Sequence, residues 1–278
     1  MSLESTKSTH PAFFAAVEAS FPGSGLYERV LVSASAMLAS RGFTKTSAIA
    51  LVSQCRDELT RPLVACVDRI WGHSFTISSL AGMVFCGRTG FLAAMHHSPQ
   101  DADGYERYVF FVGPHIAISA DGVVGEVMRP GRTGASGACG SLQAFRGELV
   151  SGGEVDLSDP LDAEQAMVKT ACLGCLAASA RGDAAPSLVE LTKIAHDAIV
   201  TQVKETVAST ERAGHKSHVA IVSGVLIHGP DGADYFWPGG FEINCADVLA
   251  DFNAACVAKT YDGVLAGYAM AKGAPEQV

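Results

Sequence analysis

Reactive side chains gather where an apolar segment of the chain ends. The run IALVSQ (49–54) stops at Cys55, and the charged residues Arg56, Asp57 and Glu58 follow at once. Open α/β folds bind their ligands beyond the carboxyl ends of strands, so a thiol and three charges at a predicted strand end indicate a reactive site. Side chains alternate along an extended segment, and we therefore expect Cys55 and Asp57 to point to the same face.

Two residues further along the chain also have the character of metal ligands. His115 begins a segment after Gly113-Pro114, and Cys139 lies in a glycine-rich stretch before a predicted helix. A catalytic zinc site uses three protein ligands, such as thiolates and imidazoles, and keeps a fourth position for water. Cys55, His115 and Cys139 could form such a set, although each of them alone is more often a buried thiol or a hydrogen-bonded histidine.

Helices and strands are predicted around these residues. Strands alternate with helices through the first half, which predicts an α/β fold with a central, mostly parallel sheet flanked by helices. We divide the chain into an N-terminal extension or helix, residues 1–20, and a single α/β domain, residues 21–278. Expected helices cover 11–20, 26–40, 60–71, 91–97, 139–149, 161–180, 186–209 and 245–258, and expected strands cover 47–54, 107–112, 115–119, 123–128, 219–228 and 233–237.

Composition excludes some classes of function. The chain has 278 residues and a net charge of −9, which argues against a nucleic-acid partner because phosphate binding needs clustered Lys and Arg. No apolar run is long enough to cross a membrane. The eight cysteines lie mostly in apolar segments, which predicts reduced thiols and a soluble, intracellular, cytoplasmic protein. The first ten residues are Ser/Thr-rich and lack an apolar core, so a secretory signal is not expected. A plastid location is the alternative, if a targeting leader has been removed.

Several long motifs, in order along the chain, resemble a known family. They are CRDELTRP (55–62), SSLAGM (78–83), GRTGFLAAMHHSP (87–99), ERYVFFVGPHIAIS (106–119) and RPGRTGASGACGSL (129–142). They are similar to motifs of the limiting-CO2-inducible protein B family, whose fold resembles that of the β-carbonic anhydrases. The resemblance implies that Cys55, His115 and Cys139 are the zinc ligands, that the protein is a homodimer, and that its small-molecule partner is CO2 or bicarbonate. Members of the family differ in whether they are active.

One departure concerns the arginine that should accompany Asp57. β-Carbonic anhydrases carry Cys-x-Asp-x-Arg, whereas here Leu59 stands four residues after Cys55. An arginine paired with Asp57 would leave the fourth zinc position open, and an unpaired Asp57 could close it. The nearest arginines are Arg56 and Arg61. We expect Arg61, near a helix start, to make the pair, and Arg56 to point to the opposite face.

The resulting hypothesis is a zinc-dependent carbonic anhydrase, a lyase in which a zinc-bound hydroxide converts CO2 to bicarbonate. Asp57, Arg61 and Arg56 are its candidate catalytic residues. A second hypothesis is a catalytically inactive member of the family, which binds inorganic carbon or a partner protein in a carbon-concentrating system. A third is a thiol redox protein that uses the CxxC of Cys172 and Cys175, although this motif lies within a helical pattern and core packing explains it better.

Overall fold

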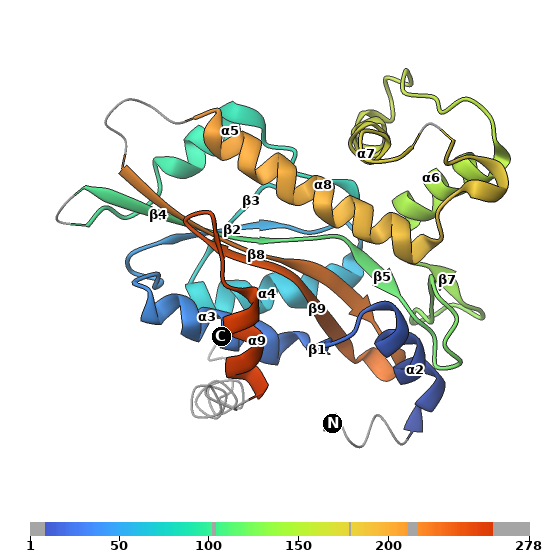
Figure 1. Ribbon diagram of the computed structural model, residues 1–278, viewed down its shortest axis with the longest axis horizontal. Helices are drawn as coiled ribbons and strands as arrows, with labels where there is room; N and C mark the ends of the chain where they lie inside the picture. Colours follow the sequence, from blue (N-terminus) through green and yellow to red (C-terminus); the bar gives the residue numbers. More distant parts are fainter. Residues whose placement is uncertain (1–8, 102–103, 178, 211–215, 258–278) are drawn as a thin grey trace.

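The computed structural model describes residues 9–101, 104–177, 179–210 and 216–257 (Figure 1). Its centre is a mixed sheet in the order β1-β9-β8-β4-β2-β3, with β5 also paired to β8 and β10 to β9. Strands β3, β2, β4, β8 and β5 are parallel, and β1, β9 and β10 add antiparallel pairs at one side. The prediction of a mostly parallel α/β sheet is confirmed. The strands are β1 (Gly25–Leu26), β2 (Ile49–Ser53), β3 (Ser74–Thr76), β4 (Tyr105–Val112), β5 (His115–Ala117), β8 (Lys216–His228), β9 (Asp234–Ile243) and β10 (Ala246–Asp247), with β6 (Glu126–Val127) and β7 (Ser136–Gly137) forming a separate ribbon.

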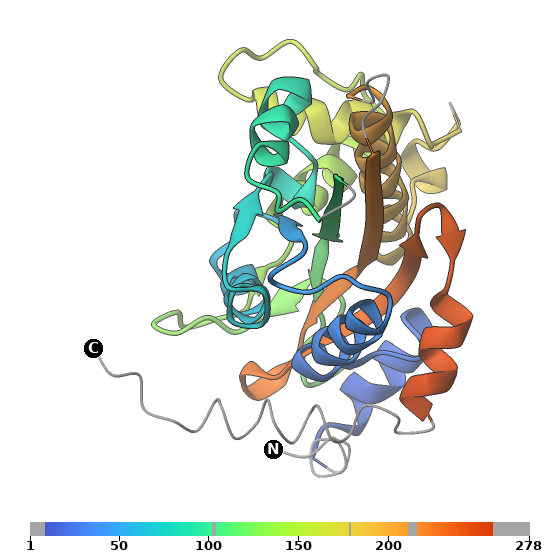
Figure 2. The same cartoon turned by 90° about the vertical axis from the view of Figure 1, so that its left-hand side faces the viewer.

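Helices cover both faces of the sheet. On one face α3, α4 and α9 pack on strand residues such as Val52, Val109 and Phe111. On the other, α5, α6, α7 and α8 pack on Leu51 and Phe110. Figures 1 and 2 show α8 along one face and α3 on the opposite one. The alternation of β4 side chains between the two cores is what a strand buried on both faces requires. The helices are α2 (Pro11–Ser20), α3 (Tyr27–Ser40), α4 (Arg61–Trp71), α5 (Gly87–Met95), α6 (Gly140–Ser151), α7 (Ala163–Leu173), α8 (Leu188–Ala208) and α9 (Leu249–Val257).

Some predicted elements differ in length from the observed ones. The helix predicted for 161–180 ends at Leu173, where Gly174 follows as its C-cap, and glycine is a poor helix former. The helix predicted from 245 begins at Leu249, because Ala246 and Asp247 pair with β9 instead. Residue 258, the predicted end of that helix, lies outside the described residues. The short strand β3 carries too few residues to give a periodic signal, and the sequence did not predict it.

A break in the sheet separates β4 from β5. Strand β8 pairs with β4 along its first part and with β5 near its end. Gly113 and Pro114 lie at the break, and proline has no N–H to donate to a ladder. A Cβ on Gly113 would overlap the carbonyl oxygen of Gly224 on β8, so only glycine permits this approach of the two backbones. The break makes His115 the first residue of a new strand.

Helix α2, near the start of the described residues, packs on the sheet. Phe13 and Val17 of α2 are buried in a third apolar cluster together with Ile116 and Tyr235. Among the residues that the structure describes, no helix is both long enough and apolar enough to span a membrane.

Candidate metal centre

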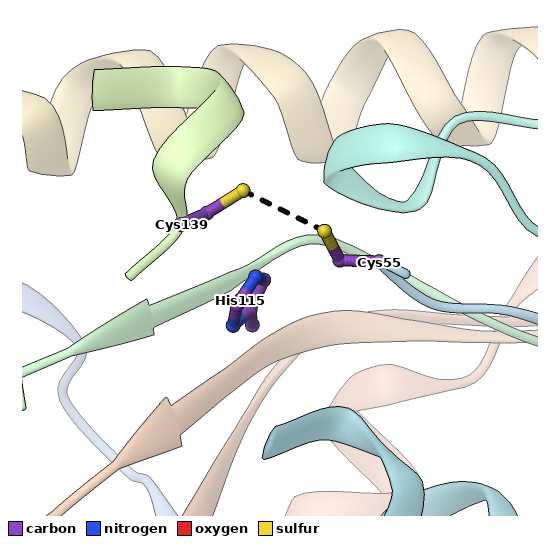
Figure 3. Close-up of side chains that lie close together, drawn as sticks. All are labelled: Cys55, His115 and Cys139. Carbon is purple, nitrogen blue, oxygen red and sulfur yellow. Dashed lines mark hydrogen bonds between the residues drawn. The ribbon is translucent and has the colours of Figure 1, made fainter. Parts of the chain in front are cut away.

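Cys55, His115 and Cys139 lie together at the carboxyl end of the parallel strands (Figure 3). Their ligand atoms all lie within 4.8 Å of one another, and the two Sγ atoms are 3.7 Å apart. The three side chains are buried, with exposed fractions of 7%, 0% and 1%. Residues separated by up to 84 positions therefore form one compact cluster that could hold a metal ion.

The fold explains how these residues meet. Cys55 follows the end of β2, and the N–H of Gly113 donates to the Ser53 carbonyl at 3.1 Å, which joins the end of β2 to the β4–β5 break. His115 is the first residue of β5. The N–H of Ala117 on this strand donates to the Ala138 carbonyl at 3.2 Å, which holds Cys139 beside β5 at the N-cap of α6.

One atom of His115 is arranged as a metal ligand would be. Its Nδ1 is 2.9 Å from Nε2 of His228. Its Nε2 is buried and has no hydrogen-bond partner among the described residues. A buried nitrogen without a partner is costly, and a metal ion would satisfy it. Two thiols and an imidazole are donors that zinc accepts, so the residues fit such an ion.

The pKa values of the two thiols indicate that a nearby cation would stabilise them as thiolates. The hydrogen bond from Cys139, which outweighs burial, and the nearby His115 lower the pKa of Cys55 to about 4. The same contact and burial raise the pKa of Cys139 well above its ordinary value. The N–H of Ala81 donates to the Cys55 sulfur at 3.3 Å and further favours this thiolate. The pair therefore holds one thiolate easily, while a second needs a cation between the sulfurs.

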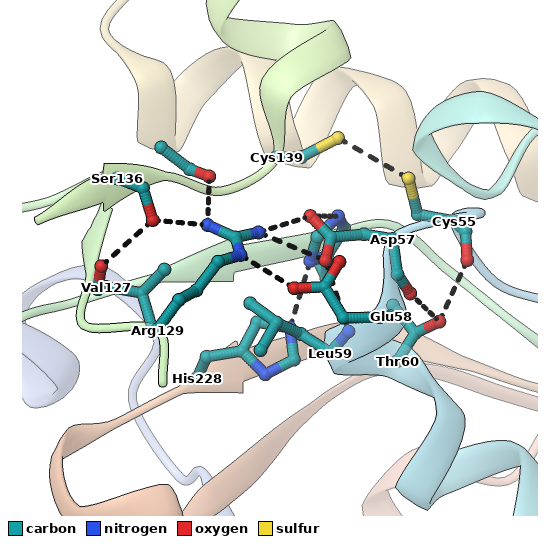
Figure 4. A network of polar contacts seen from close by, with 12 residues as sticks. Cys55, Asp57, Glu58, Leu59, Thr60, Val127, Arg129, Ser136, Cys139 and His228 are labelled. Carbon is teal, nitrogen blue, oxygen red and sulfur yellow. Dashed lines mark hydrogen bonds and ion pairs between the residues drawn. The ribbon is translucent and has the colours of Figure 1, made fainter. Parts of the chain in front are cut away.

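Asp57 lies beside the cluster and is held by Arg129 (Figure 4). Nη2 of Arg129 donates to both carboxylate oxygens, at 3.1 and 2.9 Å. The Arg129 guanidinium also donates to Glu58 Oε1 at 2.7 Å, Ser136 Oγ at 2.7 Å and the Gly137 carbonyl at 2.8 Å. These contacts fix the guanidinium from several sides, and with it the carboxylate.

The Asp57 carboxylate stays charged and close to the ligands. Burial raises its pKa, but the hydrogen bond from the Leu59 N–H, the nearby His115 imidazole and the Arg129 guanidinium together outweigh burial, so the pKa lies below its usual value. Oδ2 of Asp57 is 3.9 Å from Nε2 of His115. An ionised hydrogen-bond acceptor therefore borders the position that a fourth ligand would take.

The predicted pairing of Arg61 with Asp57 is wrong. Arg61 is exposed at the first residue of α4, and Arg129 occupies the place beside the carboxylate. The other candidate, Arg56, points away and its Nε and Nη2 donate to Glu164 at 2.6 to 2.9 Å. Arg129 is 72 residues from Asp57, and no local spacing in the sequence signals that the two meet.

Glu164 of α7 holds the segment 79–82, which contacts Cys55, through hydrogen bonds. Besides Arg56, its carboxylate accepts hydrogen bonds from Ser79 Oγ and the Leu80 N–H, both at 3.0 Å. Leu80 opens the 3-10 turn η2 (Leu80–Gly82), which also contains the N–H that donates to Cys55. The hydrogen bond from Arg56 is the largest effect that lowers the pKa of Glu164, against burial.

Burial also shifts the pKa of two residues near or outside the cluster, His228 and Cys172. His228 is buried, and burial lowers its pKa although the neighbouring Asp234 carboxylate opposes this. Cys172 of the CxxC is fully buried, and burial raises its pKa to about 12, while Cys175 is exposed. A reactive thiol needs a lowered pKa, so the structure does not favour the redox hypothesis.

Comparisons with known proteins identify a matching family and similar solved structures. The model of the family "Limiting CO2-inducible proteins B/C beta carbonic anhydrases" matches residues 26–245. A search of curated proteins finds no significant match. Among solved structures, PtLCIB4, a homolog of the limiting CO2-inducible protein LCIB, is 29% identical with a TM-score of 0.73, covering 84% of this chain and 98% of that one. LCIB itself is 26% identical with a TM-score of 0.65, covering 82% and 94%.

Proposed function

The chain belongs to the limiting CO2-inducible protein B/C family of β-carbonic anhydrases, and on this premise we propose that it is a zinc-dependent carbonic anhydrase. The reaction is the reversible hydration of CO2 to bicarbonate. One observation carries the proposal: Asp57 is held by Arg129 beside the Cys55, His115 and Cys139 cluster. A carboxylate restrained in this way cannot take the fourth ligand position.

Each residue then has a role that follows from its chemistry. Cys55, Cys139 and Nε2 of His115 would hold the zinc, and the two thiolates would balance its charge. A zinc ion held there supplies Lewis acidity, which in the carbonic anhydrases with three histidine ligands brings the pKa of a bound water to about 7. Asp57, whose Oδ2 lies 3.9 Å from Nε2 of His115, would accept a hydrogen bond from the water that reacts with CO2 and would orient that water.

The alternative of a silent member depends on the same carboxylate. A free Asp57 could swing toward the metal and close the site, because its Oδ2 already lies 3.9 Å from Nε2 of His115. Arg129 opposes this movement through two hydrogen bonds to Asp57 and three to other groups. The arrangement favours an enzyme over a protein that only binds inorganic carbon.

The test replaces one proposed ligand and one buried cysteine outside the cluster. We expect wild-type protein to contain about one zinc per chain and to accelerate CO2 hydration in stopped-flow measurements. Cys55→Ser should lose both the metal and the activity. Cys172→Ser, at a site that is as deeply buried, should keep both. Full zinc content in Cys55→Ser would refute the ligand assignment, and wild-type protein that hydrates CO2 at the uncatalysed rate would refute the activity.

A further inference from the structure

A chain of buried hydrogen bonds continues from the metal centre into the sheet. Nδ1 of His115 is 2.9 Å from Nε2 of His228, and Nδ1 of His228 is 2.9 Å from Oδ1 of Asp234. The two imidazoles are 0% and 2% exposed, so the hydrogen bond between them is shielded from water. His228 lies below the Asp57 and Arg129 pair in Figure 4. The proposed reaction assigns no role to His228 or Asp234.

The strand register builds this chain. His228, the last residue of β8, pairs with Ala117 on β5 and with Asp234 on β9. His115 lies two residues before Ala117 and therefore on the same face of the sheet. Ala117, the residue opposite His228, carries only a methyl side chain, and His115 is the diagonal neighbour of His228 in this register. Three neighbouring strands thus each contribute one member.

The hydrogen bonds have only one consistent direction when Nε2 of His115 binds a metal. Its lone pair must then face the metal, so the proton of the neutral ring is on Nδ1 and is donated to Nε2 of His228. The proton of His228 is then on its own Nδ1, where it is donated to the Asp234 carboxylate. Each nitrogen and oxygen in the chain has a partner of the opposite kind.

We infer that His228 and Asp234 are positioning residues that fix the tautomer and ring orientation of His115 for metal binding. The inference rests on the proposed function, because it requires a metal at the centre. Histidine ligands usually donate their second N–H to a carboxylate, a carbonyl or water, and loss of such a partner typically costs about 10- to 100-fold in metal affinity. Here the carboxylate acts through an intervening imidazole.

The experiment measures zinc affinity by competition with a chromophoric chelator, on folded protein at fixed pH. We expect His228→Ala to bind zinc about 10- to 100-fold more weakly than wild type. His228→Gln should recover part of this loss, because its amide oxygen can accept the proton of His115 Nδ1. Asp234→Asn keeps the His228 ring but removes the charge, so it should also weaken binding, by a smaller factor. The visible absorption bands of cobalt-substituted His228→Ala should shift as the His115 ring loses its fixed orientation.

His196→Ala provides the matched control. His196 is also a buried histidine, at 4% exposure, and it bonds to Ser223 and Asp197 outside the centre. Both alanine variants should melt at lower temperature, but only His228→Ala should lose zinc affinity. Equal affinity of His228→Ala and wild type, or an equal loss in His196→Ala, would overturn the inference.

The outcomes separate this inference from the proposed function. If wild type binds zinc, Cys55→Ser does not and His228→Ala binds as tightly as wild type, the metal centre stands and the positioning role falls. If wild type binds no zinc, both fall. If His228→Ala does not fold, Asp234→Asn decides, since it leaves the ring in place: unchanged affinity contradicts the inference and weaker affinity supports it.

Discussion

At the scale of single residues, Arg129 determines what Asp57 can do. The carboxylate is ionised and lies within reach of the metal position, and its only arginine partner among the described residues is Arg129. Two hydrogen bonds from a guanidinium that three further acceptors also hold leave the carboxylate little freedom. We therefore regard the pair, and not Asp57 alone, as the feature that separates an open site from a closed one.

Arg129→Ala tests this directly. Without the guanidinium, Asp57 can move toward the fourth ligand position, so we expect zinc content to stay near one per chain while CO2 hydration falls by about 100-fold or more. Arg61→Ala, which removes an exposed arginine that the sequence had suggested for the same pairing, should have normal activity. Normal hydration in Arg129→Ala, or equal losses in both variants, would contradict this role.

At the scale of elements, α7 holds the segment that covers Cys55. Glu164 accepts hydrogen bonds from Arg56, Ser79 and Leu80, so one carboxylate joins the residue after Cys55, the turn η2 and a helix. The Ala81 N–H that donates to the Cys55 sulfur belongs to the same turn. Weakening the hydrogen bonds of Glu164 should therefore mainly lower the stability of the fold. Its effect on the Cys55 thiolate should be smaller, because it acts through the turn η2.

Glu164→Gln should lower the free energy of unfolding by about 1 kcal/mol near neutral pH, as expected for a partly exposed ion pair that also accepts hydrogen bonds. The pKa of Glu164 is lower in the folded state than its ordinary value of 4.5. A lowered pKa gives stability that is present above the unfolded pKa and is lost as the pH falls through the folded one. The difference between wild type and variant, measured by urea unfolding, should be constant from pH 6 to 7 and shrink below about pH 4. A difference that grows on acidification would contradict the assignment.

The break between β4 and β5 is the second element on which the site depends. A Cβ on Gly224 would overlap the Trp237 carbonyl oxygen, and a Cβ on Gly113 would in turn overlap the Gly224 carbonyl oxygen. We expect Gly224→Ala to destabilise the protein by about 3 kcal/mol, because backbone must move to admit the methyl group. Gly134→Ala, where an added Cβ meets nothing within 4 Å, should be nearly neutral in the same denaturant titration. A neutral Gly224→Ala would show that the strands can shift without cost.

How far the sequence predicts this structure depends on the range of the interaction. Helices such as α3 and α8, and the hairpin of β8 and β9, follow from periodicity and turn residues, which are local signals. Arg129 does not follow, because its approach to Asp57 depends on the fold of the glycine-rich stretch between β6 and β7. His228 is hidden for a similar reason, since only the register of β5 against β8 brings it to His115.

At the scale of the whole molecule, the candidate metal centre joins parts of the fold that are distant in sequence. Its proposed ligands come from the end of β2, the start of β5 and the start of α6, and the two cysteines are buried between the sheet and the helices of one face. Without a cation this region keeps two close sulfurs and a buried nitrogen that has no hydrogen-bond partner in the described part of the chain. Metal binding and folding should therefore be coupled.

We expect zinc to raise the unfolding temperature and a strong chelator to lower it. A ligand that binds only the folded state stabilises it by about 2.7 kcal/mol at a free concentration of 100 times its Kd, which in a domain of this size amounts to roughly 5 °C or more. Cys139→Ser provides the control, because it removes a proposed ligand and should make the unfolding temperature independent of zinc. Calorimetric scans of wild type and variant, each with zinc and with chelator, measure the four temperatures. The same shift in both proteins would mean that zinc binds elsewhere, and no shift in wild type would mean that the cluster does not link a metal to the stability of the fold.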